Sequence, residues 1–96
     1  MSSRPTFLIR NKQGQPLETV RLAERVVLFG IAECAYHRRN DDRSEWRLSH
    51  VETGALIGRG PSKDEAFADA IKKAQSVSRL RLGIARMREI VRMAGC

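Results

Sequence analysis

The chain contains few of the residues on which large folds, disulfide frameworks and membrane spans depend. Its 96 residues include one Trp, one Tyr, three Phe and two Cys. No apolar run approaches the roughly 20 residues that a membrane span needs. A chain of this length forms one small core that buries about 60–65% of its unfolded surface. We therefore expect a single small domain over residues 1–96, without a membrane span.

The two cysteines give no sign of a disulfide framework. Cys34 and Cys96 lie far apart, and residues 1–5 contain no apolar segment of the kind found in secretory signals. We therefore expect a reducing, cytoplasmic location, with Cys34 as a small core residue.

Metal-binding and catalytic patterns are also scarce. Cys34 and His37 have Cys-x-x-His spacing, but a zinc site normally needs a second close pair, which His50 and Cys96 do not supply. Strand alternation would also turn Cys34 and His37 to opposite faces. No nucleophile, base or carboxylate pair shows a catalytic arrangement. We expect neither metal nor cofactor, and no enzyme activity.

Positive charge is what the chain has in excess. Lys and Arg number 18 against 11 Asp and Glu, which gives a net charge of +7, and fourteen of the 18 are Arg. Arg stays charged and forms bidentate bonds with phosphate and carboxylate, so the excess suits a polyanion or an acidic protein surface. The same bias also arises in GC-rich genomes.

Alternation and turn residues predict several strands. Thr6–Arg10 is a short apolar run before a turn-rich segment, and a further strand is expected from Ile31 to His37. The polar residues 37–43 predict a hairpin loop. Two more strands, Glu45–Val51 and Ala55–Arg59, flank a Thr-Gly turn and should pair in antiparallel fashion.

The segment between Leu17 and Phe29 is ambiguous. Val20, Ala23 and Val27 recur at helical spacing, whereas residues 26–29 are rich in strand-forming side chains. Pro16 favours a helix start and Gly30 a break. We expect a helix from Leu17 to Phe29, with two strands as the alternative interpretation.

The C-terminal third predicts helices. Ser62 and Glu65 form a capping box that starts the first one. Its expected inner face is Phe67, Ala70, Ile71, Ala74 and Val77. A second stretch from Ser78 to Met93 continues the pattern at Leu80, Ile84, Met87, Val91 and Ala94, either without interruption or after a bend at residues 76–78. The expected fold is α+β: an antiparallel sheet of three to four strands with helices on one face and an extra C-terminal helix.

The last helix is amphipathic and basic. Residues 77–96 contain five Arg and one Glu, and the arginines flank the apolar stripe on both sides. Such a helix could follow a phosphate backbone, cover the edges of the sheet with Arg stems, face an acidic partner protein, or pair with its own copy through Val77, Ile84 and Val91.

Residues 58–70 carry a resemblance. Gly58, Gly60, Ser62, Lys63, Ala66 and Ala70 stand where a double-stranded-RNA-binding domain has its last strand and Ala-rich helix. The chain resembles the C-terminal half of that family, with residues 17–76 as the corresponding core. Lys63 matches one of the family's three phosphate-binding lysines, and Asp64 and Phe67 stand at the other two positions. The resemblance implies an RNA-binding domain.

Together these features predict a non-enzymatic nucleic-acid-binding domain, for RNA rather than DNA, that uses an Arg-rich surface. The alternative is a small protein-interaction module, an inhibitor or adaptor, that binds an acidic partner or forms a homodimer through its C-terminal helix. Trp46 and Tyr36 would stack on bases if they faced outward, but we expect Trp46 in the core. The expected site residues are Arg38, Arg39, Arg59, Lys63, Arg79, Arg86 and Arg88.

Overall fold

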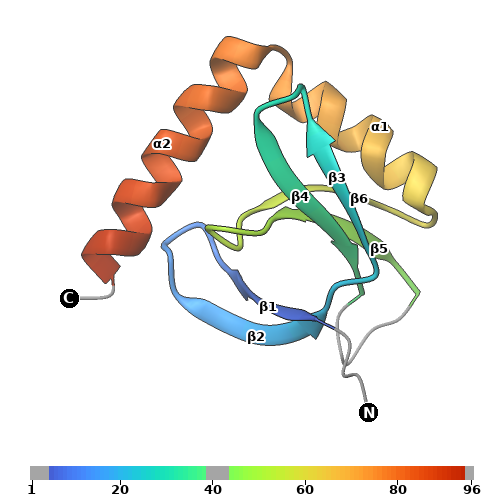
Figure 1. Cartoon of the computed structure of the whole chain (residues 1–96), viewed down its shortest axis with the longest axis horizontal. Helices are drawn as coiled ribbons and strands as arrows, with labels where there is room; N and C mark the ends of the chain where they lie inside the picture. The colour runs from blue at the N-terminus through green and yellow to red at the C-terminus, as the bar shows by residue number, and fades with distance from the viewer. Residues whose placement is uncertain (1–4, 39–43, 95–96) are drawn as a thin grey trace.

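Six short strands and two helices account for the apolar patterns of the sequence. The computed structural model describes residues 5–38 and 44–94. Its elements, shown in Figure 1, are β1 (Thr6–Arg10), β2 (Pro16–Arg21), β3 (Glu24–Leu28), β4 (Ala32–His37), β5 (Trp46–His50), β6 (Leu56–Gly60), α1 (Lys63–Ala74) and α2 (Val77–Ala94). The expected α+β fold is confirmed, as are the strands at Thr6–Arg10 and over residues 32–37, 46–50 and 56–59.

The strands form two antiparallel sheets. β1 and β2 make a hairpin, and β3, β4, β5 and β6 make a four-stranded meander in that order. Both helices lie on one face of the meander and the hairpin lies on the other (Figure 1). Strand β4 shows why both faces are buried: Cys34 and Tyr36 belong to the helix-side core, whereas Ala35 belongs to the hairpin-side core. The hairpin therefore fills the layer opposite the helices.

The predicted helix from Leu17 to Phe29 is wrong, and the two-strand interpretation holds. This segment forms β2 and β3, separated by Leu22 and Ala23. Strand β3 then turns back into β4 through Phe29 and Gly30, whose φ angles are 52° and 71°. Positive φ at both central residues matches the twist of a two-stranded ribbon. Because Leu22 and Ala23 interrupt the two strands, the alternation of apolar and polar residues changes phase between β2 and β3. Val20, Ala23 and Val27 therefore recur at the spacing of a helix although they belong to strands and the connection between them.

Helix α1 sits unusually close to β6. Ser62 caps it, because the hydroxyl of Ser62 accepts a hydrogen bond from the backbone N–H of Glu65 at 3.2 Å. Its buried line is Ala66, Ala70 and Ala74, with the predicted Phe67 and Ile71 only partly buried beside it. A Cβ on Gly58 would lie 2.4 Å from the carbonyl oxygen of Ala66. Small residues on both elements therefore allow this close contact.

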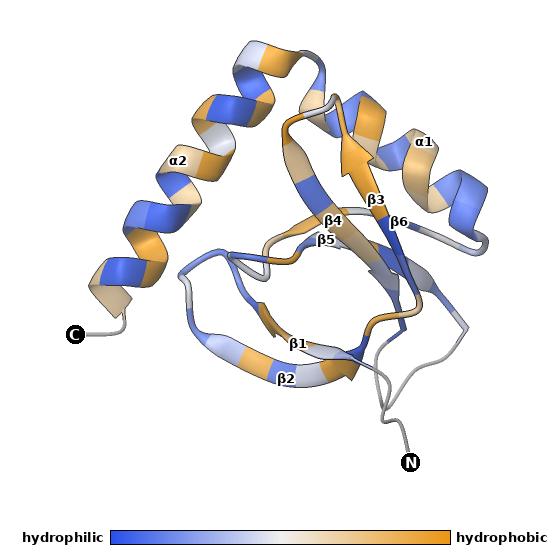
Figure 2. Ribbon diagram, in the orientation of Figure 1, coloured by the Kyte–Doolittle hydropathy of each residue, from blue (hydrophilic) through white to orange (hydrophobic). Residues whose placement is uncertain are grey.

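Helix α2 starts in a new direction after a break at Gln75. Gln75 has a φ of 67°, so the chain bends where the sequence allowed either a bend or a continuous helix. Of the predicted inner face, Leu80, Ile84 and Met87 are buried, and Val91 and Ala94 are not. Apolar and polar residues alternate along α2 in Figure 2. The helix thus anchors on the core through its first three turns.

The far end of α2 rests on the turn between β1 and β2. A Cβ on Gly14 would lie 2.8 Å from Cγ2 of Ile90, so the two backbones approach closely there. The side chain of Asn11 holds this turn together, because its Oδ1 accepts hydrogen bonds from the backbone N–H groups of Gln13 and Gln15. Helix α2 is therefore supported near both ends, and a hollow lies between the supports.

Candidate binding groove

A groove of about 920 Å³ separates α2 from β6 and the turn between β1 and β2. Its nine apolar lining residues come from β6 with the residue before it, from the end of α1 and from α2: Ala55, Leu56, Ile57, Ala74, Leu80, Leu82, Ile84, Met87 and Ile90. Leu56 and Leu82 are 42% and 71% exposed. Side chains this exposed carry apolar surface that the fold itself does not cover.

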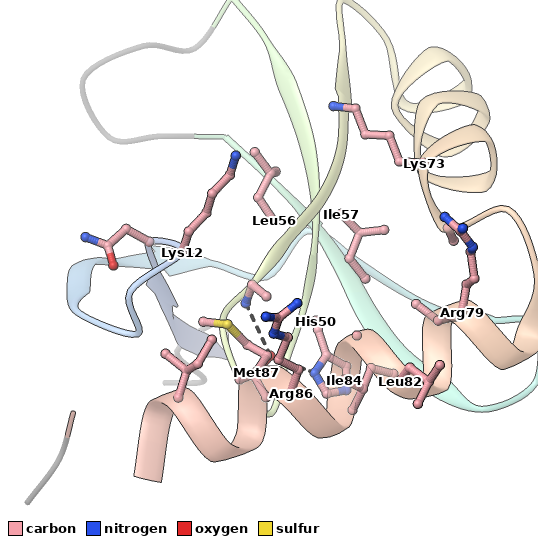
Figure 3. Close-up of a pocket in the computed structure, with 17 residues that line it drawn as sticks. Lys12, His50, Leu56, Ile57, Lys73, Arg79, Leu82, Ile84, Arg86 and Met87 are labelled. Atoms are coloured by element: carbon pink, nitrogen blue, oxygen red, sulfur yellow. Dashed lines mark hydrogen bonds between the residues drawn. The ribbon is translucent and has the colours of Figure 1, made fainter. Parts of the chain in front are cut away.

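Four cationic side chains surround this apolar floor. Lys12, Lys73, Arg79 and Arg86 line the groove, and Figure 3 shows them spread around Leu56 and Ile57. Among the residues that the structure describes, no acidic side chain lines the groove. Lys73 forms an ion pair with Asp69 at 3.0 Å. For Lys12, Arg79 and Arg86 the described part of the chain supplies no ion pair, so the groove has a net positive potential.

Of the seven predicted site residues, Arg79 and Arg86 lie at this groove. Arg88 lies elsewhere on α2, where its Nε and Nη2 donate hydrogen bonds to the two carboxylate oxygens of Glu52, each at 2.7 Å. These bonds lower the pKa of Glu52 and raise that of Arg88. Arg88 is therefore already neutralised within the chain.

A second group of predicted residues gathers at Trp46. The guanidinium carbon of Arg38 lies 4.1 Å from the centre of the Trp46 ring, and Nζ of Lys63 lies 4.9 Å from it. Lys63 also forms an ion pair with Glu24 at 3.1 Å. Trp46 is half-buried against the helix-side core, as expected. Both cations lie over an aromatic ring, and Lys63 is in addition paired with a carboxylate.

The two remaining predicted residues join neither group. Arg59 on β6 is exposed, and its backbone N–H donates to Oδ2 of Asp69 at 3.0 Å. Arg39 lies outside the described residues, as does most of the predicted hairpin loop at residues 37–43. The six predicted cations that the structure describes therefore do not share one surface. Two lie at the groove, two lie over Trp46, and Arg59 and Arg88 lie apart from both groups.

The two histidines are buried and structural. Nδ1 of His50, at the floor of the groove, lies 2.8 Å from the hydroxyl of Thr53, and Nε2 of His37 lies 2.7 Å from the hydroxyl of Ser49. Burial lowers the pKa of His37 to about 4 and also lowers the pKa of His50. Because His37 and Ser49 are each 1% exposed, this pair has no access to a substrate.

Cys34 and His37 face opposite sides of the sheet, as strand alternation predicted. Cys34 lies in the helix-side core, while His37 packs edge-on against Phe7 of the hairpin with ring centres 5.3 Å apart. Burial, together with the charge of Glu33, raises the pKa of the Cys34 thiol to about 12. No cluster of three or more metal-ligating side chains occurs in residues 5–38 and 44–94.

Most of the groove was not predicted from the sequence. Lys12, Lys73 and Leu82 were not among the expected site residues. Lys73 and Leu82 come from the two helices and meet only because the chain bends at Gln75, whereas Lys12 comes from the distant first hairpin. The sequence contains one signal that could have found the groove: Leu82 is a large apolar residue that lies off the predicted apolar stripe of this helix.

Comparisons with known proteins add no family. No protein-family model, no curated protein and no solved structure matches this chain. In the described segments, neither helix combines the length and hydropathy needed to cross a membrane.

Proposed function

We propose that this chain is a non-enzymatic interaction module that binds an acidic, partly apolar segment of a partner protein in the groove between α2 and β6. One observation carries the proposal: nine apolar and four cationic residues line the same groove, and no acidic residue among the described ones does. Apolar surface drives association, and complementary charge selects the partner and orients it.

The balance of apolar and cationic side chains favours a protein over a nucleic acid. Most hydrogen bonds in nucleic-acid complexes go to phosphate and sugar, and those interfaces are more polar and more basic than protein interfaces. A phosphate backbone would leave Leu56 and Leu82 largely uncovered. A peptide with apolar and acidic side chains would cover both leucines and pair with Arg79 and Arg86.

A peptide-display selection tests the proposal. The wild-type protein is used to select from a library of random short peptides, and the enriched sequences should combine Asp or Glu with Leu, Ile, Phe or Met. Arg86→Glu should weaken binding of these peptides at least about tenfold, because it reverses a charge at the groove. Arg81→Glu is the matched control, since Arg81 is an exposed cation on α2 outside the groove.

A second pair of variants tests the apolar contribution. Leu82→Ala should weaken binding about tenfold, because Leu82 is 71% exposed when free and would be covered in the complex. Met93→Ala, at a residue 69% exposed on the same helix but outside the groove, should leave binding unchanged. Neither substitution removes a buried side chain, so the fold should remain intact.

Two results would overturn the proposal. The first is equal loss of peptide binding in Arg86→Glu and Arg81→Glu. The second is binding of a short duplex RNA or DNA that is tighter than peptide binding, falls steeply with salt and depends on Arg86. That second result would support the nucleic-acid function predicted from the sequence.

A further inference from the structure

We infer that the segment bound in the groove is an α-helix that crosses α2 at Gly83. This inference rests on the proposed function, and it names the conformation of the partner and its point of closest approach. It follows from three features of the groove: a blocked strand edge, an accessible flank of α2 whose residues have helical spacing, and a glycine whose small size the chain itself does not use.

The blocked edge argues against an added strand. β6 is an edge strand, so an extended peptide could in principle pair with it. At one end of β6, Arg10 forms a parallel bridge with Ala55 and donates its N–H to the carbonyl of Gly54 at 2.9 Å. At the other end, Asp69 accepts the N–H of Arg59. Residues 56–58 remain between them, which is shorter than an ordinary strand.

The flank of α2 that faces the groove has the spacing that a partner helix requires. Leu80, Ile84 and Met87 are buried against the rest of the fold, whereas the accessible lining residues of α2 are Arg79, Leu82, Arg86 and the half-buried Ile90, at steps of three, four and four. From Arg79 to Ile90 this wall extends about 16 Å, which is close to three helical turns. A helix with apolar residues that meet Leu82 and Ile90 would pack along the wall. Its flanking acidic residues would meet Arg79 and Arg86, two turns apart on α2.

Gly83 lies in the middle of this wall. Glycine inside a helix is unfavourable relative to alanine. A Cβ on Gly83 would meet no atom within 4 Å, so the packing of the chain does not require a glycine. Gly83 nevertheless lines the groove between Leu80 and Ile84. A partner helix that crosses α2 at this residue would use the missing side chain to bring the two backbones close together.

Two synthetic peptides test the conformation. Both contain the same numbers of Glu, Ala and Leu; in one, the leucines share a helical face, and in the other the order is scrambled so that they do not. The first should bind at least about tenfold more tightly. It should also gain helical circular dichroism when mixed with the wild-type protein.

Gly83→Ala tests the point of contact. The added methyl group should raise the Tm of the free protein by about 4 °C, because alanine favours the helix. The same methyl group should weaken binding of the helical peptide about tenfold by holding the two helices apart. Because the variant is more stable than wild type, weaker binding cannot be attributed to unfolding.

The possible failures are distinguishable. Equal affinity for the ordered and scrambled peptides would overturn the helical conformation, and unchanged affinity in Gly83→Ala would overturn contact at Gly83. Either result leaves the proposed function standing if Arg86→Glu still weakens both peptides. If Arg86→Glu changes neither affinity, the proposed function itself is wrong, and this inference falls with it.

Discussion

Helices α1 and α2 meet the same sheet in different ways. α1 lies against β6 through Ala66, Ala70 and Gly58, so closely that one added methyl group would overlap backbone atoms. α2 touches the core with larger side chains and leaves a groove beside them, where Gly83 faces open space. Both helices contain small residues at central positions. Packing within the chain explains Ala66 and Ala70 of α1, which lie against Gly58 of β6, but it does not explain Gly83 of α2. The difference locates the surface that is available to a partner.

The largest expected effect comes from filling the α1 contact. Gly58→Ala would place a Cβ 2.4 Å from the carbonyl oxygen of Ala66 and 2.5 Å from the backbone nitrogen of Ala70. Helix α1 must then move away from β6, at a cost of about 3 kcal/mol in the free energy of unfolding. Urea denaturation measures this change. Gly83→Ala is the matched control and should change stability by about 1 kcal/mol in the opposite direction.

Acidification should act on both faces of the sheet, through His37 on the hairpin side and through His50 at the floor of the groove. Burial lowers the pKa of His37 from 6.5 to about 4, so the folded state binds fewer protons than the unfolded state between these values. Stability is therefore complete above pH 6.5 and falls by about 3 kcal/mol as the pH decreases to 4. His50 contributes with the same sign, because its pKa is also lowered.

Urea denaturation at a series of pH values measures this loss. The carboxylates of Glu52 and Asp69 also have lowered pKa values, so they destabilise the protein only at pH below their ordinary values of 4.5 and 3.8. His37→Gln should reduce the slope of the curve between pH 6.5 and 5, and the slope that remains is the contribution of His50. A stability that stays constant over this range in the wild type would contradict the burial of a neutral His37.

A smaller effect is expected at the contact of α2 with the core. Leu80 is buried but borders the groove, so water can reach the space left by Leu80→Ala. The substitution should reduce the free energy of unfolding by about 2 kcal/mol, at the low end for a buried leucine. Val77→Ala, at a residue 40% exposed on the same helix, serves as the control. A loss as large as that of Gly58→Ala would show that α2 is held as tightly as α1.

The smallest effect should come from the ion pair that joins α2 to the sheet. Arg88 and Glu52 are both 56% exposed, so water and salt screen the attraction between them. Arg88→Ala should leave the urea midpoint close to that of the wild type. The pKa of the Glu52 carboxyl, followed by NMR, should return toward its ordinary value, because the Arg88 hydrogen bonds lower it. A large loss of stability would mean that this pair, and not Leu80, anchors α2.

Local signals predicted the parts of the fold that local chemistry determines. Ser62 and Glu65 marked the start of α1, and alternation around Trp46 and Leu48 marked β5. The segment at 17–29 failed because Phe29 occupies a turn position with positive φ, where asparagine, aspartate or glycine is usual. Without a usual turn residue at position 29, the sequence did not indicate a hairpin. The apolar residues on either side of the break at Leu22 and Ala23 could then equally be read as one face of a helix.

The groove depends on tertiary geometry and was only partly predictable. Arg79 and Arg86 were identified from their place on a basic amphipathic helix, and both line the groove. Their apolar neighbours could not be assigned, because Leu56 and Leu82 come together only through the bend at Gln75 and the support of α2 on the first hairpin. Sequence patterns identify which residues a helix presents, but not the gap that its tilt leaves open.

The contact between Gly14 and Ile90 makes the first hairpin a spacer for the whole helical layer. The tight turn, with a φ of 80° at Gly14, determines how near the last turns of α2 can come to the strands. A bulkier residue at this turn would push the end of α2 outward and widen the mouth of the groove without altering any side chain on its floor. The aperture offered to a partner is thus fixed by residues that the partner need never touch.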